Sequence, residues 1–466
     1  MTATSTFTPP VASAPRISGR APIARLTWLL ARPSAQSAAV LALPAIAFAV
    51  TTALVLIVLG GGLMFWRWTP ADNPDATVYQ TLSVLALVLL LVPLASLGGA
   101  AARLSARRRD DRLATLRLLG ATPGVVTQMT VLESTAIAVF GSVVGIVLYL
   151  MAMPLVGLIP FGGAAIGGGE LWVGFGALLM VVVAIAALAA LSAAIGLRQV
   201  TISPLGVRTR QKAPKMHWMR IVLGVALVLG AYALLGSMSG IANEALTIAV
   251  LGTGIGIGIG VLNLIGPWAI GVAAKLSLRR ANTPAKLIAA RGILESPKAA
   301  WRQVSGVAMT SFIAVVAGTG IAFVSSLTGD YEQDTMLLLA DVRTGIIITV
   351  VTSFLMVACS VGVNQAANVL DRRDLYVSLD RLGMPREVIE RSRSRTVMAP
   401  LRFVAFGSAL IGAVLVLPLV GITFIVAPTS LAVIAGCLVG GVLLVWLSLR
   451  ATTPVLTRVL SQPERL

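Results

Sequence analysis

The stretch LWVGFGALLMVVVAIAALAALSAAIGL, Leu171–Leu197, runs for 27 residues without a charged side chain. About 20 mainly apolar residues are enough for an α-helix to cross the hydrocarbon core of a bilayer. Comparable apolar runs recur along the chain, whereas a membrane β-barrel would show short segments of alternating hydrophobicity. The sequence therefore predicts an all-α polytopic membrane protein.

The composition supports this class. The 466 residues are 57% hydrophobic and 12% charged, with a mean hydropathy of +0.93. A soluble domain carries roughly twice that charged fraction. We expect about ten transmembrane helices, near residues 38–66, 81–102, 125–154, 171–197, 219–237, 243–272, 303–328, 344–367, 399–421 and 424–448.

The distribution of basic residues predicts the orientation. If the N-terminus is cytoplasmic, 34 of the 36 Lys and Arg residues fall in cytoplasmic segments, and only Arg67 and Arg343 lie outside them. This separation follows the positive-inside rule. We expect a multi-pass protein of the bacterial inner membrane with both termini in the cytoplasm. The net charge of +18 belongs to these loops, so we expect no nucleic-acid partner.

The residue types that carry catalysis or bind metals are scarce. Cys359 and Cys437 both lie in apolar runs, and His217 is the single histidine. Zinc sites and disulfide scaffolds need clustered cysteines or histidines. We expect no catalytic residue and no metal site, and the sequence leaves the substrate-binding residues unknown.

A repeated element follows the second predicted span of each half. The first copy reads RRRDDRLATLRLLGATPGVV, Arg107–Val126, and the second reads DRRDLYVSLDRLGMPREVI, Asp371–Ile389. Each copy predicts a short amphipathic helix that ends at a glycine. A solvated connector is the alternative, but repetition favours a docking helix. The repeat predicts two pseudo-symmetric four-helix sets joined by two linking helices.

The segments of the chain follow from these spans. We expect a cytoplasmic tail and interfacial helix at 1–36, and the first four-helix set at 37–198. Two linking helices with cytoplasmic loops occupy 199–302, the second four-helix set 303–450, and a cytoplasmic tail 451–466.

Glycines are concentrated in the sixth predicted span, where GTGIGIGIG places Gly252, Gly256 and Gly260 four residues apart. Small residues at this spacing let another helix approach closely. The run is not a nucleotide-binding loop, because no strand precedes it and no Lys-Ser/Thr follows it. We therefore predict helix packing at these three glycines.

The first copy resembles the FtsX-like ABC transporter permeases, the type VII or mechanotransmission class. The resemblance rests on basic residues, an acid, Leu-Arg-x-Leu-Gly-Ala-Thr and then Glu133 in the next span. The segment at Ala289–Arg302 also resembles the family's amphipathic lead-in. The second copy departs from the pattern, since Asp380 stands where the first copy has Arg117 and Thr396 where it has Glu133.

The resemblance implies a permease subunit that is not itself an enzyme. One permease chain would work with two copies of an ABC ATPase, which would bind ATP and Mg²⁺, while this chain binds no cofactor and contacts membrane lipid. The implied ATPase-coupling residues come from both copies of the repeat: Arg108, Arg109, Asp111, Leu113, Leu116, Arg117, Leu119, Gly120, Arg372, Arg373, Asp374, Leu379, Leu382 and Gly383.

The resemblance also implies a function, namely export or extraction of a hydrophobic or amphipathic substrate such as a lipid, peptide or antibiotic. Two alternatives stay open. One is a mechanotransmission signalling protein that regulates an extracellular partner without moving solute. The other is a secondary transporter, although such proteins usually place ionisable residues near the bilayer midplane. The predicted outer loops are short, the longest lying near 67–80, 155–170 and 329–343.

Overall fold

The computed structural model describes residues 38–69, 74–107, 123–201, 219–236, 244–326, 333–426 and 428–461. These residues are almost entirely helical, and they include one small antiparallel hairpin of β1 (Pro160–Phe161) and β2 (Ala164–Ala165). Helices dominate because a chain in lipid must satisfy its backbone polar groups internally. The prediction of an all-α polytopic membrane protein is confirmed.

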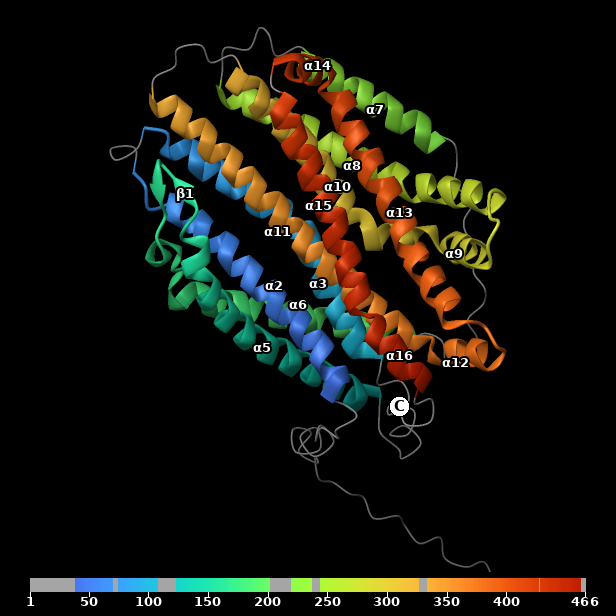
Figure 1. Cartoon of the computed structure of the whole chain (residues 1–466). Helices are drawn as coiled ribbons and strands as arrows, with labels where there is room; N and C mark the ends of the chain where they lie inside the picture. Colours follow the sequence, from blue (N-terminus) through green and yellow to red (C-terminus); the bar gives the residue numbers. More distant parts are fainter. Residues whose placement is uncertain are drawn as a thin grey trace, which may run out of the picture.

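Each predicted span corresponds to a helix (Figure 1). The first four are α2 (Ala38–Phe65), α3 (Ala76–Arg107), α5 (Pro123–Val156) and α6 (Gly174–Thr201). The linking helices are α7 (Met219–Gly236) and α8 (Glu244–Arg279). The last four are α10 (Pro297–Ser326), α11 (Gln333–Asp371), α13 (Arg386–Leu415) and α15 (Pro428–Ala451).

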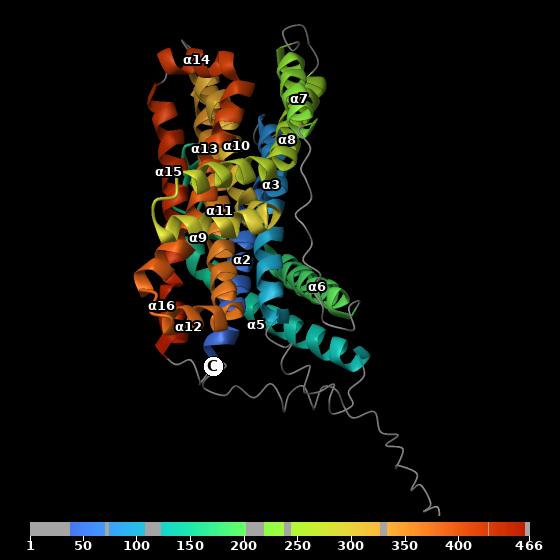
Figure 2. The same ribbon diagram turned by 90° about the vertical axis from the view of Figure 1, so that its right-hand side faces the viewer.

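Short elements lie between and after these helices. They are the 3₁₀ helix η1 (Gly168–Leu171) and the α-helices α9 (Pro284–Glu295), α12 (Arg373–Arg381), α14 (Leu417–Val426) and α16 (Thr453–Ser461). Helix α9 is the amphipathic lead-in expected before the second half, and it packs on α8 and α13. In both views α12 and α16 lie together at one end of the bundle and α14 lies at the other (Figures 1 and 2).

Eight of the described helices are long and apolar enough to cross a membrane. The predicted spans near 81–102 and 219–237 are helical, as α3 and α7, but they are not among these eight. The described part of α3 contributes a shorter apolar segment, Ala76–Leu90. Membrane insertion of these two helices, and hence the count of ten, stays a prediction.

Helix contacts follow the same pattern in the two sets. In the first, α2 packs on α3 and α5, and α3 on α6. In the second, α10 packs on α11 and α13, and α11 on α15. The sets meet through α11, which packs along α3 and also touches α2. The linking helices contact the second set, where α8 lies against α10 and α13.

Helix α11 is buried on two opposite faces. Val350, Phe354, Val357 and Val361 recur at helical spacing and belong to the hydrophobic core of the second set. Met356, Val363 and Ala367 lie on the other face and belong to the core of the first set. One continuous helix of 39 residues, about 58 Å long at 1.5 Å per residue, therefore contributes to both cores.

The close packing of α8 against α10 lies at other glycines than those predicted. A Cβ added at Gly256 or Gly260 would meet no described atom within 4 Å, whereas one at Gly258 would clash with the ring of Phe312 and one at Gly266 with the ring of Trp301, both on α10. The i, i+4 pattern marks one helix face, but α10 packs against another. Gly252 lies in α8, and its packing falls outside the described residues.

Another close contact between small residues involves α5. A Cβ at Gly141 would lie 2.7 Å from the carbonyl oxygen of Ala45, and one at Gly145 would lie 2.5 Å from that of Ala49. This is a G-x-x-x-G contact, in which the backbones of α5 and α2 touch. The spacing is visible in the sequence and would have predicted the contact.

Candidate functional site

The second copy of the repeat forms α12 and the turn that follows it. Asp374 lies in the first turn of α12 and Arg381 in the last. The negative charge near the N-terminus and the positive charge near the C-terminus both interact favourably with the helix dipole. Gly383 has φ +82°, a left-handed conformation that glycine adopts without a steric penalty. The amide of Gly383 donates to the carbonyl of Asp380, and that of Met384 to Leu379, both at 3.0 Å. This pair of hydrogen bonds is a Schellman motif, which ends the helix at a fixed residue.

The inner face of α12 packs against α16 and the start of α13. Tyr376, Val377 and Leu379 are partly buried there. They lie against a small core that is separate from the two large ones and consists of Val369, Ile389, Leu456 and Leu460. Leu379, which the sequence predicted as an ATPase-coupling residue, therefore packs partly against this chain's own small core.

Two leucines at the edge of this face remain exposed. Leu375 is 50% exposed and Leu382 is 83% exposed. They are seven residues apart, so they lie on one side of α12.

Charged side chains flank these leucines. Arg372 is exposed, and Arg373 lies 3.4 Å from Asp374 in a solvent-facing pair. Arg386, at the start of α13, lies 3.4 Å from Asp380. Such exposed pairs contribute little to stability, so their charges are available to a partner.

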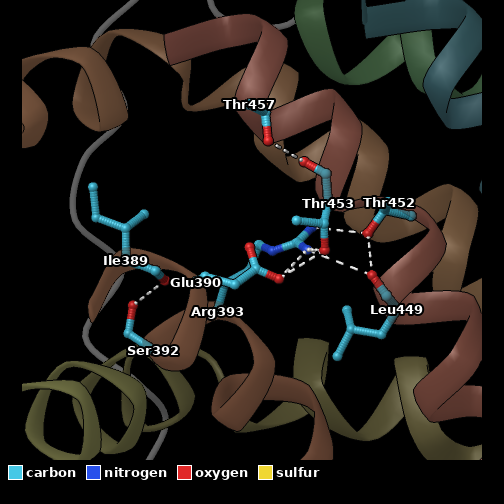
Figure 3. A network of polar contacts seen from close by, with 8 residues as sticks. All are labelled: Ile389, Glu390, Ser392, Arg393, Leu449, Thr452, Thr453 and Thr457. Atoms are coloured by element: carbon cyan, nitrogen blue, oxygen red, sulfur yellow. Dashed lines mark hydrogen bonds and ion pairs between the residues drawn. The ribbon is translucent and has the colours of Figure 1, made fainter. Parts of the chain in front are cut away.

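A buried polar network joins α13 to the junction of α15 and α16 (Figure 3). The side chain of Arg393 is only 3% exposed, and it donates to Thr452 Oγ1 at 2.8 Å and to Glu390 Oε1 at 3.0 Å. Thr453 Oγ1 donates to the same Glu390 oxygen at 2.9 Å. A buried arginine needs such partners, because an unpaired buried charge is costly. The network fixes α16 in place, and α16 in turn supports α12.

Burial of Tyr376 at this corner raises the pKa of its hydroxyl above the ordinary value, and this outweighs the opposing effect of Arg372 and Arg393. The phenol therefore stays neutral at physiological pH. We refer to residues 372–393 together with 449–460 as the coupling corner.

Residues 108–122, which make up most of the first copy of the repeat, lie outside the described residues. The predicted coupling residues Arg108, Arg109, Asp111, Leu113, Leu116, Arg117, Leu119 and Gly120 all fall in this gap. Helix α5 begins at Pro123, directly after it.

A second polar contact joins the two sets far from the coupling corner. Tyr79 Oη, on α3, donates to Asp341 Oδ2 on α11 at 2.7 Å. The amide of Gly162, in the β1–β2 turn, donates to the same oxygen at 2.7 Å. Asp341 is 4% exposed. The sequence did not single out this residue, because an acid at the start of a span is equally typical of a loop.

Comparison with known proteins agrees with the sequence pattern. Residues 100–202 match the family described as FtsX-like permease C-terminal. The matched range begins in α3, includes the first copy of the repeat and ends at α6. No match was found among curated proteins.

Proposed function

We propose that this chain, whose residues 100–202 match the FtsX-like permease family, is the permease subunit of an ABC transporter driven by a separate ATPase. The observation that carries this proposal is the coupling corner. There Leu375 and Leu382 are exposed on a helix whose other face is packed and whose end is fixed by Gly383.

The geometry supports a simple route for motion. An ATPase that grips α12 would displace the end of α11, since Asp371 and Arg373 are almost adjacent in the chain. Helix α11 continues to the contact with α3, so the displacement would rock one set against the other as rigid bodies. The network around Arg393 would keep α12, α13 and α16 moving together.

Among the leucines that would enter an ATPase groove, Leu375 takes the place of Leu379, and the others are those that the repeat indicated. In the second copy we propose Leu375 and Leu382, with Arg372, Arg373 and Asp374 at the rim. In the first copy we propose Leu116 and Leu119, with Arg108, Arg109, Asp111 and Arg117 around them. Two ATPase subunits, one for each copy, would serve a single permease chain. The cargo would be hydrophobic or amphipathic.

The test is affinity purification of the full chain from the membranes of its own cell. A co-purifying protein with ATP hydrolysis activity is the expected result. Leu382→Asp and Leu116→Asp should each reduce its recovery, because each places a charge in an apolar contact. Leu287→Asp is the matched control, since it adds the same charge to an exposed leucine on α9.

Each variant must first reach the membrane in wild-type amounts. If the variants at Leu382 and Leu116 both retain the ATPase, the repeat is a charged connector and the proposed coupling is wrong. If no ATPase is recovered with the wild-type chain, the transporter assignment itself fails. Movement of cargo in vesicles then separates a transporter from a signalling protein.

A further inference from the structure

A cavity of about 240 Å³ lies in the second set, between α10, α11 and α15. The three helices contact one another around it. Its lining is mainly apolar and includes Ala314, Ile321, Ile347, Val350, Val433 and Ile434. Arg343 carries the one charge among the lining residues, and Ser430 adds a hydroxyl.

Arg343 and Ser430 interrupt a lining that is mainly apolar. Ser430 lies in the first turn of α15, whereas Arg343 lies about three turns into α11, and Met336, Leu339 and Ala340 line the cavity before it. Val350 and Cys437 lie seven residues farther along the same two helices, about 10 Å deeper at 1.5 Å per residue. The cavity therefore has an exposed cation on its α11 wall, with apolar lining on either side of it along that helix.

Arg343 and Arg67, the two basic residues outside the predicted cytoplasmic loops, differ in their partners. Arg67 is held within the chain, since it lies 3.4 Å from Glu170 and donates to the carbonyl oxygen of Trp172 at 2.6 Å. No described residue forms an ion pair or hydrogen bond with Arg343. Asp341 is two positions away, faces the other side of α11 and is engaged by Tyr79.

We propose that this cavity binds an anionic phospholipid, with one acyl chain inside it and the phosphate at Arg343 and Ser430. An arginine forms strong, charge-assisted hydrogen bonds to phosphate oxygens. The cavity, at about 240 Å³, is too small for a whole phospholipid. It therefore holds part of one chain, while the headgroup and second chain remain in the surrounding bilayer. Arg343 directly precedes the predicted span at 344–367 and lies in the first third of the candidate span Thr335–Leu370, toward the end where headgroups lie.

This inference does not rest on the proposed function, because lipid binding needs neither an ATPase nor a cargo. The experiment is native mass spectrometry of the full chain in detergent, titrated with phosphatidylglycerol or phosphatidylcholine. We expect one phosphatidylglycerol to be retained in preference to phosphatidylcholine. Arg343→Gln should weaken phosphatidylglycerol binding about tenfold, which corresponds to about 1.4 kcal/mol, and should abolish the preference.

Two further variants distinguish headgroup from chain. Ile347→Trp fills the interior and should remove both lipids, whereas Arg67→Gln removes the other cation outside the predicted cytoplasmic loops and should keep the preference. Unaltered thermal unfolding confirms that each variant is folded. Phosphatidylglycerol binding by Arg343→Gln at wild-type affinity would overturn the headgroup assignment. Retention of lipid by Ile347→Trp would show that the chain lies elsewhere. Equal retention of the two lipids by the wild type would also refute the proposal.

Discussion

The hydroxyl of Tyr79 donates a 2.7 Å hydrogen bond to the carboxylate of Asp341, which lies 262 positions later in the chain. The two residues belong to different four-helix sets, on α3 and α11. Asp341 is 4% exposed and also accepts from the amide of Gly162. The contact therefore fastens the two sets together at a buried point.

Removal of this hydroxyl should loosen the sets. Tyr79→Phe leaves the Asp341 carboxylate with one donor fewer, and we expect a loss of about 1–3 kcal/mol of stability. Thermal unfolding of the purified chain measures it. Tyr232→Phe is the control, because Tyr232 is 41% exposed, and it should change stability by less than about 0.5 kcal/mol. Equal effects of the two variants would show that the contact is not stabilising.

The Arg393 network should matter far more than a neighbouring surface pair. Arg393→Ala leaves Glu390 half-buried without its cation, and we expect a loss of about 3 kcal/mol. Arg391→Ala removes the exposed ion pair with Glu387, which lies at 3.0 Å, and should cost less than about 1 kcal/mol. Hydrogen exchange of the α16 amides is the sharper measurement, because α16 should lose protection only in Arg393→Ala. Unchanged α16 protection in that variant would contradict the anchoring role.

The turn after α12 should depend on glycine. Gly383→Ala forces a Cβ into a backbone with φ +82°, at an expected cost of about 1–2 kcal/mol. Gly292→Ala, within α9, should instead be neutral or stabilising by up to about 1 kcal/mol, since its Cβ would meet only Thr396 at 4.0 Å. Denaturant unfolding compares the two. The amount of ATPase that co-purifies should fall only with Gly383→Ala. If the two variants recover equal amounts of ATPase, the turn after α12 is not needed for ATPase binding.

The orientation of the chain can be tested with introduced cysteines. We expect Asp75→Cys to react with a membrane-impermeant thiol reagent from outside, and Asp374→Cys only from the cytoplasmic side. The physical reason is the charge separation, since basic loops are retained in the cytoplasm. Both variants are made in a background without Cys359 and Cys437. Reaction of Asp75→Cys from the cytoplasmic side alone would invert the predicted topology.

The composition of the complex follows from the two copies of the repeat within one chain. We expect a purified complex of one permease chain and two ATPase subunits. Its mass, measured by light scattering with detergent correction, provides the check. A mass that requires two permease chains would mean that each chain engages a single ATPase.

Local features could be read from the sequence because their causes are local. The length of an apolar run sets whether a helix can span a bilayer, so the all-α membrane class followed from stretches such as Leu171–Leu197. The end of α12 at Gly383 followed from the need for a left-handed residue after a helix. The repeat predicted a helix in the segment that forms α12.

Other features were decided only by the tertiary structure, because they depend on which helix faces lie together. The leucines of α12 look alike in the sequence, yet packing against α16 covers Leu379 and leaves Leu382 open. The run of arginines near Arg393 reads as a charged loop, but the α15–α16 junction buries one of them. Likewise, α10 meets α8 at Gly258, not at the periodic glycines on either side. The spacing of residues along a helix determines which of them share a face, whereas the helix that packs beside it determines whether that face is buried or exposed.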